Sequence, residues 1–321
     1  QQKYLNSLIS NGDNEDNVLR PEDTYYKGGF FEGLYHGKNC KLREKTIKYD
    51  GGFYKGEYHG RICKLFESKT EDGTIIEYEG GMSNGLYSNG KHTCKLKVTK
   101  TKDNSTQEYT GGMISGLFSG KGKLKMFDST KYEGGFKAGQ FHGAGHLMTK
   151  IYMYKGYFIN GAYHGNGELK WLSASHVDKK IEKGGFKNGI LHGNKCSITY
   201  KNGAKYTGSV QYGLFTGQGT FCNEEKQKVY QGQWLENKYH GFGKTFRLDD
   251  GSISYEGNFL RGLKHGQGKY IRKDGSVQYA GTSTNDRMTG TGTLFFSSGA
   301  TYVGEIVEKI PHGFGVKTDK F

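Results

Sequence analysis

The chain has 321 residues, of which only 33% are hydrophobic, together with 53 glycines and two prolines. This composition excludes an ordinary compact core of that size, because too little apolar surface is available for burial. The formal net charge is +14 at pH 7. Because the lysines and arginines are spread along the chain and accompany no nucleic-acid-binding motif, we expect no nucleic-acid partner.

The chain begins with a polar, acidic segment around residues 11–17, whose sequence is NGDNEDN. We predict that residues 1–24 form a linker or N-terminal extension, because such a segment lacks the apolar residues that a core requires. From residue 25 to residue 321 a single motif recurs twelve times. A short motif repeated over nearly the whole chain predicts an array of small supersecondary units.

The clearest copy of the motif begins at Tyr132. Its positions are Tyr132, Gly134, Phe136, Gly139, His142, Gly143 and Gly145. Side chains alternate across a pleated strand, so the spacing of two residues between Tyr, Gly and Phe places all three on one face. Residues 137–140 then form a turn in which Gly139 can adopt a positive φ. Each copy of the motif is therefore predicted to be a β-hairpin.

This turn also predicts the pairing of residues across the hairpin. We expect Phe136 opposite Phe141, Gly134 opposite Gly143, and Tyr132 opposite Gly145. An aromatic ring can lie flat across a neighbouring strand only where that strand carries no side chain. The alternation of glycine and aromatic residues is therefore expected to let rings cover the backbone of the sheet.

The leading aromatic position is tyrosine in every copy except one. It is held by Tyr26, Tyr49, Tyr78, Tyr109, Tyr132, Tyr154, Tyr206, Tyr230, Tyr255, Tyr279 and Tyr302, and by Glu182 in the exception. Successive copies are joined through tight-turn signals such as Asn202-Gly203 and Asp274-Gly275. The predicted fold class is all-β: an elongated, single-layer antiparallel β-meander or solenoid of about twelve stacked β-hairpins.

The pattern Tyr-x-Gly-x-Phe-x-x-Gly-x-x-His-Gly-x-Gly resembles the MORN repeat (membrane occupation and recognition nexus). The resemblance covers residues 25–321, and a motif repeated in phase is far more specific than a single match. Similar proteins include radial-spoke head components of cilia and ring-forming proteins of protist cytoskeletons. The resemblance therefore implies a structural component of a ciliary or other cytoskeletal assembly.

Four cysteines and eight histidines recur at fixed places in the motif. Cys40, Cys63, Cys94 and Cys196 take the place of the second glycine, with at least one additional residue before them, which predicts a β-bulge. The histidines are His36, His59, His142, His164, His192, His240, His265 and His312. Adjacent repeats lie about two strand spacings apart, too far for a disulfide or a shared zinc ion. We interpret both sets as structural.

No nucleophile, base and orienting group occur together outside the repeat pattern. We therefore predict that the chain is not an enzyme, and we identify no catalytic residue, no metal ligand and no cofactor. No apolar stretch approaches the roughly 18 residues of a membrane span, and no secretion signal is present. We expect a cytoplasmic location, at the cytoskeleton and in the cilium or axoneme.

Three columns of bulky residues are expected on one face of the sheet. The leading residues form the first column, and the second includes Phe136 and Phe158. The third column comprises Tyr35, Tyr58, Tyr87, Phe118, Phe141, Tyr163, Phe215 and Tyr239 as candidate binding residues. A continuous apolar strip of this length has to be covered. Either the sheet curls so that rings of the first two columns cover one another, or the third column lines a groove for a partner's amphipathic segment.

The motif diverges from about residue 260 onward. Ser283 replaces the second-column aromatic residue, Thr289 replaces the histidine, and Lys264 stands in the third column. We expect a different surface here, one that meets another subunit or a following domain. An open sheet edge at Val316 would also permit self-association through the C-terminal repeats.

These observations favour a non-catalytic scaffold that holds other proteins of a larger assembly along an aromatic groove. One alternative is a membrane-apposed tether, in which the dispersed positive charge makes weak contact with anionic phospholipid. A second alternative is the regulatory arm of an enzyme whose catalytic domain lies outside this chain.

Overall fold

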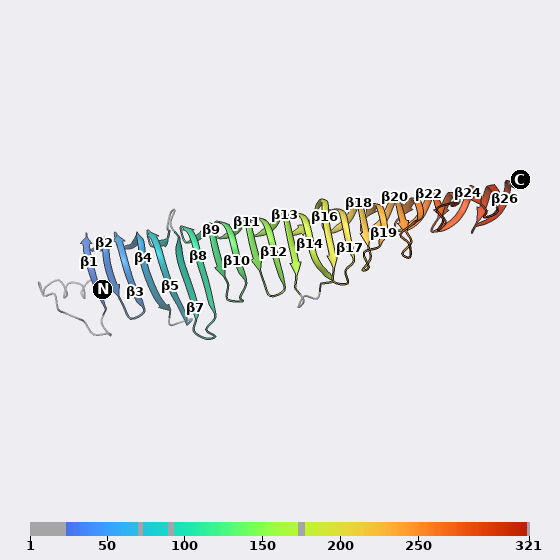
Figure 1. The fold of residues 1–321 in the computed structure, drawn as a ribbon. Helices are drawn as coiled ribbons and strands as arrows, with labels where there is room; N and C mark the ends of the chain where they lie inside the picture. Colours follow the sequence, from blue (N-terminus) through green and yellow to red (C-terminus); the bar gives the residue numbers. More distant parts are fainter. Residues whose placement is uncertain (1–23, 70–72, 89–92, 173–176, 320–321) are drawn as a thin grey trace, which may run out of the picture. The chain divides into compact units, whose positions relative to one another are not determined.

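The computed structural model describes residues 24–69, 73–88, 93–172 and 177–319. These residues form 26 strands that pair antiparallel in one open sheet, and no helix occurs among them. The predicted fold class, a β-meander of hairpins, is therefore confirmed (Figure 1). The predicted linker at residues 1–24 lies almost entirely outside the described residues.

The chain divides into two compact units. The first comprises residues up to 128 together with 136–139, and the second comprises residues 129–135 and those from 140 onward. Strands of the first unit are β1 (Tyr25–Phe31), β2 (Leu34–Arg43), β3 (Ile47–Tyr54), β4 (Glu57–Lys69), β5 (Thr74–Ser83), β6 (Leu86–Tyr87), β7 (Cys94–Lys100), β8 (Thr106–Ile114) and β9 (Leu117–Lys125).

Strand β10 (Lys131–Lys137) contributes to both units. Strands of the second unit are β11 (Gln140–Met148), β12 (Tyr152–Ile159), β13 (Ala162–Trp171), β14 (Lys179–Lys187), β15 (Ile190–Leu191), β16 (Gly193–Tyr200), β17 (Lys205–Gln211), β18 (Leu214–Cys222), β19 (Lys228–Leu235), β20 (Lys238–Phe246), β21 (Ile253–Leu260), β22 (Leu263–Ile271), β23 (Val277–Thr284), β24 (Arg287–Phe295), β25 (Thr301–Val307) and β26 (Ile310–Thr318). Each copy of the motif supplies the two arms of one hairpin.

The turn at the tip of each hairpin has two residues in the left-handed region. In the turn between β10 and β11, Ala138 has φ +48° and Gly139 has φ +80°. Two successive positive φ values match the right-handed twist of paired strands, which is why glycine recurs at the second position. The prediction that Gly139 adopts a positive φ is confirmed.

The predicted pairing of the two strands is correct for the residues beside the turn and wrong for the residues further from it. In the hairpin of β12 and β13, Phe158 pairs with Tyr163 as expected, but Gly156 pairs with Gly167 and not with Gly165. A bulge after His164 shifts the register, and Gly165 at φ +60° provides the left-handed residue that the bulge requires. The leading Tyr154 consequently pairs with Leu169.

The hairpin that begins at Tyr132 shows the same correction. A Cβ at Gly134 would lie 2.6 Å from the Cα of Gly145, and a Cβ at Gly145 would lie 2.6 Å from Cε2 of Tyr132. Gly134 is thus adjacent to Gly145 and not to Gly143, and the Tyr132 ring covers Gly145. The expected role of these glycines, to leave room for a ring over the backbone, is confirmed.

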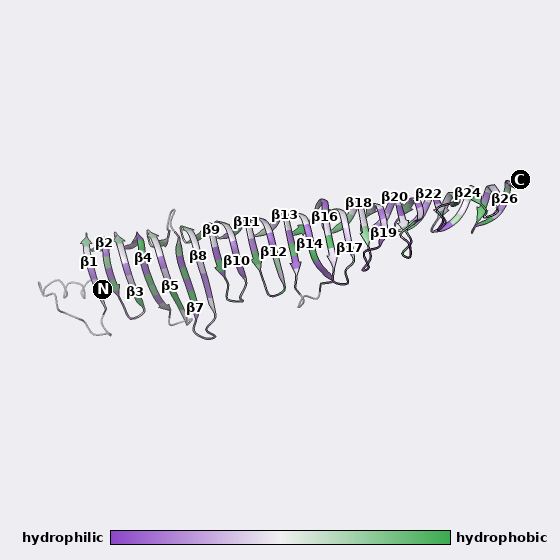
Figure 2. Ribbon diagram, in the orientation of Figure 1, coloured by the Kyte–Doolittle hydropathy of each residue, from purple (hydrophilic) through white to green (hydrophobic). Residues whose placement is uncertain are grey.

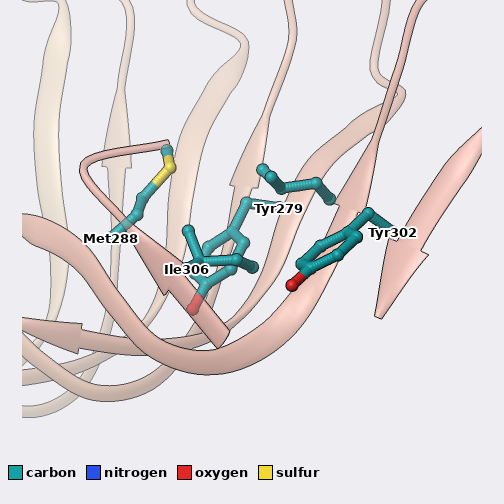
Figure 3. Packing of buried hydrophobic residues seen from close by; sticks show 5 residues of the cluster. Tyr279, Met288, Tyr302 and Ile306 are labelled. Atoms are coloured by element: carbon teal, nitrogen blue, oxygen red, sulfur yellow. The ribbon is translucent and has the colours of Figure 1, made fainter. Parts of the chain in front are cut away.

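The core of each unit lies on one face of the sheet. Tyr154 and Phe158, from the first and second columns, are fully buried. Hydrophobic and hydrophilic residues alternate along the strands, as the period of a half-buried strand requires (Figure 2). In the divergent C-terminal repeats, Tyr279, Met288, Leu294, Tyr302 and Ile306 form a cluster of buried side chains on this face (Figure 3).

Candidate functional site

The leading tyrosines form the base of the candidate site. The hydroxyl of Tyr132 donates a hydrogen bond of 2.9 Å to the carbonyl of Gly135, three residues further on. The same bond to the third following carbonyl is made by Tyr26, Tyr49, Tyr78, Tyr109, Tyr154, Tyr206, Tyr230, Tyr255, Tyr279 and Tyr302. Each ring therefore lies along its own strand, with its hydroxyl bound at the bulge.

Burial changes the acidity of these hydroxyls. It raises the pKa of Tyr132 and the pKa of Tyr154 to about 12, because an ionised phenolate would lose its hydration. The backbone hydrogen bond acts in the opposite direction on Tyr154, through the carbonyl of Tyr157. Desolvation is the larger cause, so these rings remain neutral hydrogen-bond donors.

The third column stacks on the first, one ring on another within each hairpin. Ring centroids of Tyr132 and Phe141 lie 3.8 Å apart with planes at 16°, and those of Tyr206 and Phe215 lie 3.6 Å apart at 4°. The remaining predicted groove residues, Tyr35, Tyr58, Tyr87, Phe118, Tyr163 and Tyr239, contact the leading tyrosine of their own hairpin with centroids 3.8–4.3 Å apart.

We call these eight third-column residues the aromatic row. All of them except Phe215 are only half-buried, whereas the second-column residues beneath, such as Phe158, are buried in every hairpin but the first, where Phe30 is exposed. The aromatic row is thus the outermost layer of the apolar face in each unit. Each of its rings holds one face against a leading tyrosine, and every ring except that of Phe215 is partly exposed.

Two of the recurring histidines link neighbouring hairpins, whereas Nδ1 of His142, His240 and His265 is buried without a hydrogen-bond partner. Nδ1 of His36 accepts a hydrogen bond of 3.5 Å from the backbone N–H of Lys55, and Nδ1 of His192 accepts one of 3.4 Å from Tyr212. Both donors lie in the turn of the following hairpin. At these two histidines the side chain therefore makes a structural contact beside the turn, and the structural role of the others stays a prediction.

The cysteines occupy the second-glycine position as predicted. Cys40 pairs with Gly51 after a register shift that follows Gly37, which confirms the expected bulge. The hydroxyl of Tyr49 lies 3.1 Å from Sγ of Cys63, and both side chains are buried. No disulfide joins Cys40, Cys63, Cys94, Cys196 and Cys222.

Two further features limit the kinds of site that the described residues can form. These residues contain no group of three or more His, Cys, Asp or Glu side chains arranged to hold a metal ion. The described part of the chain also contains no helix long and apolar enough to cross a bilayer.

The divergent C-terminal repeats contain a cavity of about 500 Å³. Lys264, which replaces an aromatic-row residue, lies on its wall with Nζ 5.0 Å from the ring centroid of Tyr255 and 4.6 Å from that of Tyr270. Burial lowers the pKa of Lys264. Arg287 and Glu308 form an ion pair of 3.0 Å on the same wall. The surface here is charged, unlike the aromatic row.

One important feature was not predicted from the sequence. The sequence shows that Glu182 takes the place of the leading tyrosine. It does not show that a cavity lies at this point of the apolar face. The signal was present in the alignment of the copies, because this copy also has Leu191 at the aromatic-row position.

Comparisons with known proteins match the chain to a family model and to a curated relative. The MORN repeat family model matches residues 109–130, 132–148, 154–172, 206–223, 230–246, 255–277, 279–301 and 302–320. The hairpins outside these segments are those that carry Cys40, Cys63, Cys94 and Cys196. The chain is also 33% identical over 121 residues to "MORN repeat-containing protein 3" of Xenopus laevis. That alignment covers 38% of this chain and 39% of the relative's length.

Proposed function

Because this chain is a MORN-repeat protein, we propose that it is a non-catalytic scaffold that binds a segment of a partner protein along its aromatic row. The observation that supports this most directly is that most rings of that row are half-exposed above a layer that is buried in every hairpin but the first. In the hairpin of β12 and β13, Tyr163 is half-buried whereas Tyr154 and Phe158 beneath it are not exposed at all.

The geometry of the aromatic row favours a peptide segment over a small ligand. From Tyr35 to Tyr239 one ring occurs in every hairpin except that of Leu191, so a bound segment would meet an anchor point about every two strand spacings. Buried aromatic anchors supply most of the binding energy at protein interfaces. An amphipathic segment would place its apolar side chains between these rings and its polar side chains toward solvent.

The assembly to which the scaffold belongs is part of the proposal. The resemblance to radial-spoke head and cytoskeletal MORN proteins supports a place in a ciliary or other cytoskeletal structure inside the cell. We also propose that residues 25–321 act as one array, and that the charged surface beyond residue 260 contacts a second partner or another copy of the chain.

The decisive experiment removes the rings while keeping the fold. Phe141, Tyr163 and Tyr239 are replaced together by leucine, which the chain itself carries at the equivalent position, Leu191. The immobilised variant should keep its circular dichroism spectrum but release a partner that the wild-type protein retains from a native extract. Leucine removes the flat ring face on which a partner side chain would pack, at about 0.5–1.5 kcal/mol for each ring, so the three replacements together should strongly weaken retention.

The matched control replaces three exposed rings outside the aromatic row: Tyr157, Tyr212 and Phe242, which are 56%, 58% and 51% exposed. Their replacement by leucine should leave partner retention unchanged. If the control variant loses the partner and the aromatic-row variant keeps it, partners bind elsewhere and the proposed function is wrong.

A second candidate function is membrane apposition, which one observation favours. Large apolar side chains flank several turns and face solvent, including the pairs Ile114 and Leu117 in the first unit and Leu260 and Leu263 in the second. Together with the net charge of +14, such a turn could touch an anionic bilayer. Because the charge is not clustered, binding should depend on total anionic lipid and disappear as salt screens it.

Vesicle flotation tests this candidate. Vesicles of phosphatidylcholine with and without phosphatidylserine are compared at low and high salt, with Leu260 and Leu263 replaced by serine in a variant. Salt-resistant binding to one phosphoinositide would instead favour a dedicated membrane tether.

A further inference from the structure

The stack of rings is interrupted at one hairpin of the second unit. On one side Tyr154 stacks on Tyr163 with centroids 3.8 Å apart, and on the other side Tyr206 stacks on Phe215 at 3.6 Å. The hairpin between them has Glu182 and Leu191 at the same two positions. Two rings are therefore replaced by two smaller side chains.

A cavity of about 390 Å³ lies at this interruption. Its lining includes Tyr152, Tyr163, Trp171, Lys179, Glu182 and Phe186. This volume falls within the range of about 300–1,000 Å³ that is typical of ligand sites. We call it the Glu182 cavity.

The walls of the Glu182 cavity are aromatic and held in place by one another. Phe186 meets Tyr163 edge to face, with centroids 6.1 Å apart and planes at 84°. Tyr152 meets Trp171 at 5.6 Å and 64°. A further ring entering between them would find both ring faces and ring edges, which are the favourable partners for an aromatic group.

The charge in the Glu182 cavity is already balanced. Glu182 is 7% exposed, and its Oε2 accepts a hydrogen bond of 3.1 Å from Nε1 of Trp171. Its Oε1 forms an ion pair of 2.8 Å with Nζ of Lys179. Because this ammonium neutralises the carboxylate, the cavity does not require a cationic ligand and suits a neutral aromatic group.

We propose that the Glu182 cavity binds a tyrosine or tryptophan side chain of a partner protein, which takes the place of the missing ring. The inference rests on the proposed function, since the side chain would belong to the segment that lies along the aromatic row. It adds the point at which that segment is fixed in register. The glycines Gly189 and Gly213 also line the cavity, and contribute no side chain that would block entry.

The two tryptophans of the chain provide a direct assay. Trp171 lines the Glu182 cavity, whereas Trp234 donates its Nε1–H to the carbonyl of Gly219 in another hairpin. In the nitrogen-15 spectrum each indole gives one signal, assigned with Trp234→Phe. Titration with p-cresol, the side-chain analogue of tyrosine, should shift the Trp171 signal in a saturable manner and leave the Trp234 signal in place.

Two variants should abolish this shift by filling the Glu182 cavity. Glu182→Tyr restores the leading ring and Leu191→Phe restores the aromatic-row ring, so each should weaken p-cresol binding by more than about tenfold. The control Glu182→Gln keeps the size of the side chain and should still bind p-cresol. Circular dichroism tests whether all three variants remain folded. The two filling variants change different positions, so if one of them does not fold, the other still tests the inference.

Several outcomes would overturn the inference. These are equal shifts of both indole signals, the absence of any shift, an unchanged titration in both filling variants, or a response to butylammonium but not to p-cresol. The last result would identify a cation site. The inference and the proposed function fail separately: if the aromatic-row variant releases the partner while Glu182→Tyr retains it, the groove remains supported and only the anchor is wrong.

Discussion

The ring of Tyr163 stacks on the ring of Tyr154 with centroids 3.8 Å apart and planes at 15°. The lower ring is completely buried and its hydroxyl is bound to the carbonyl of Tyr157, whereas the upper ring is half-buried. This division separates two tasks. The buried leading tyrosines stabilise the sheet, whereas the aromatic row forms its partly exposed surface.

Replacement of Tyr163 by leucine and by serine tests this division. Leucine keeps most of the apolar contact, so the loss in the free energy of unfolding should be limited to the ring-pair contribution of about 0.5–1.5 kcal/mol. Serine also exposes the Tyr154 ring and should cost more, about 2–4 kcal/mol. Urea denaturation measures both values, and Tyr157→Leu at an exposed position is the control. Equal costs for leucine and serine would contradict the stacking interpretation.

The close approach of Tyr132 to Gly145 predicts a strong effect of one methyl group. Because a Cβ at Gly145 would lie 2.6 Å from Cε2 of Tyr132, Gly145→Ala should displace the ring and destabilise the protein by about 1–3 kcal/mol. Thermal unfolding followed by circular dichroism at 218 nm would show the loss.

The control for this change is Gly116→Asn. No atom lies within 4 Å of a Cβ at Gly116, and asparagine tolerates its φ of +77°. The chain already places Asn237 with φ +66° at the equivalent turn position. A similar melting temperature for the Gly145 and Gly116 variants would show that the ring moves aside without cost.

Cys63 tests the structural interpretation of the cysteines. Cys63→Ala removes the sulfur near the Tyr49 hydroxyl, but that hydroxyl keeps its 2.7 Å bond to the carbonyl of Gly52. The expected loss in stability is about 1 kcal/mol or less. Cys63→Leu places a larger side chain in a fully enclosed position and should cost about 1–3 kcal/mol. Loss of partner binding in a fully folded Cys63→Ala variant would show that the thiol has a functional role.

Much of the fold was predictable because the motif repeats a two-residue period. The spacing of Tyr132, Gly134 and Phe136 determines a strand and its buried face, and Gly139 determines the turn. The pairing beyond the turn was not predictable from spacing alone. Gly143 has φ +74°, and Gly145, two residues further on, allows a ring to approach the backbone closely. The sequence alone does not distinguish these two roles, because both residues are glycine.

The candidate site was predictable to a similar extent. The alternation of side chains predicted that the aromatic row lies on the apolar face. It did not predict that these rings contact the leading column. The stacking of Tyr163 on Tyr154 follows from the bulge, which brings Gly156 opposite Gly167 and leaves space for the lower ring over these two glycines. The Glu182 cavity lies where this pair of stacked rings is missing. The replacement of tyrosine by Glu182 was visible in the sequence, but the cavity that results was not.

The last prediction concerns alkaline pH. Burial raises the pKa of ten leading tyrosines, from Tyr26 to Tyr279, above the ordinary value of 10.0, and to about 12 in Tyr132 and Tyr154. The protonated hydroxyl is therefore favoured in the folded state, whereas the unfolded chain releases its protons near pH 10. Tyrosine burial should contribute its full stability below pH 10, and that contribution should fall as the pH rises toward 12.

Two measurements on the same samples test this prediction. Absorbance at 295 nm follows tyrosine ionisation, and circular dichroism at 218 nm follows the loss of strands. Because the buried hydroxyls ionise only when the sheet opens, part of the absorbance change should coincide with unfolding. Tyr132→Phe, which has no proton to release at this position, should reduce the pH dependence of stability between pH 10 and 12. Complete ionisation of all tyrosines before any loss of strand signal would contradict the proposed role of the buried column.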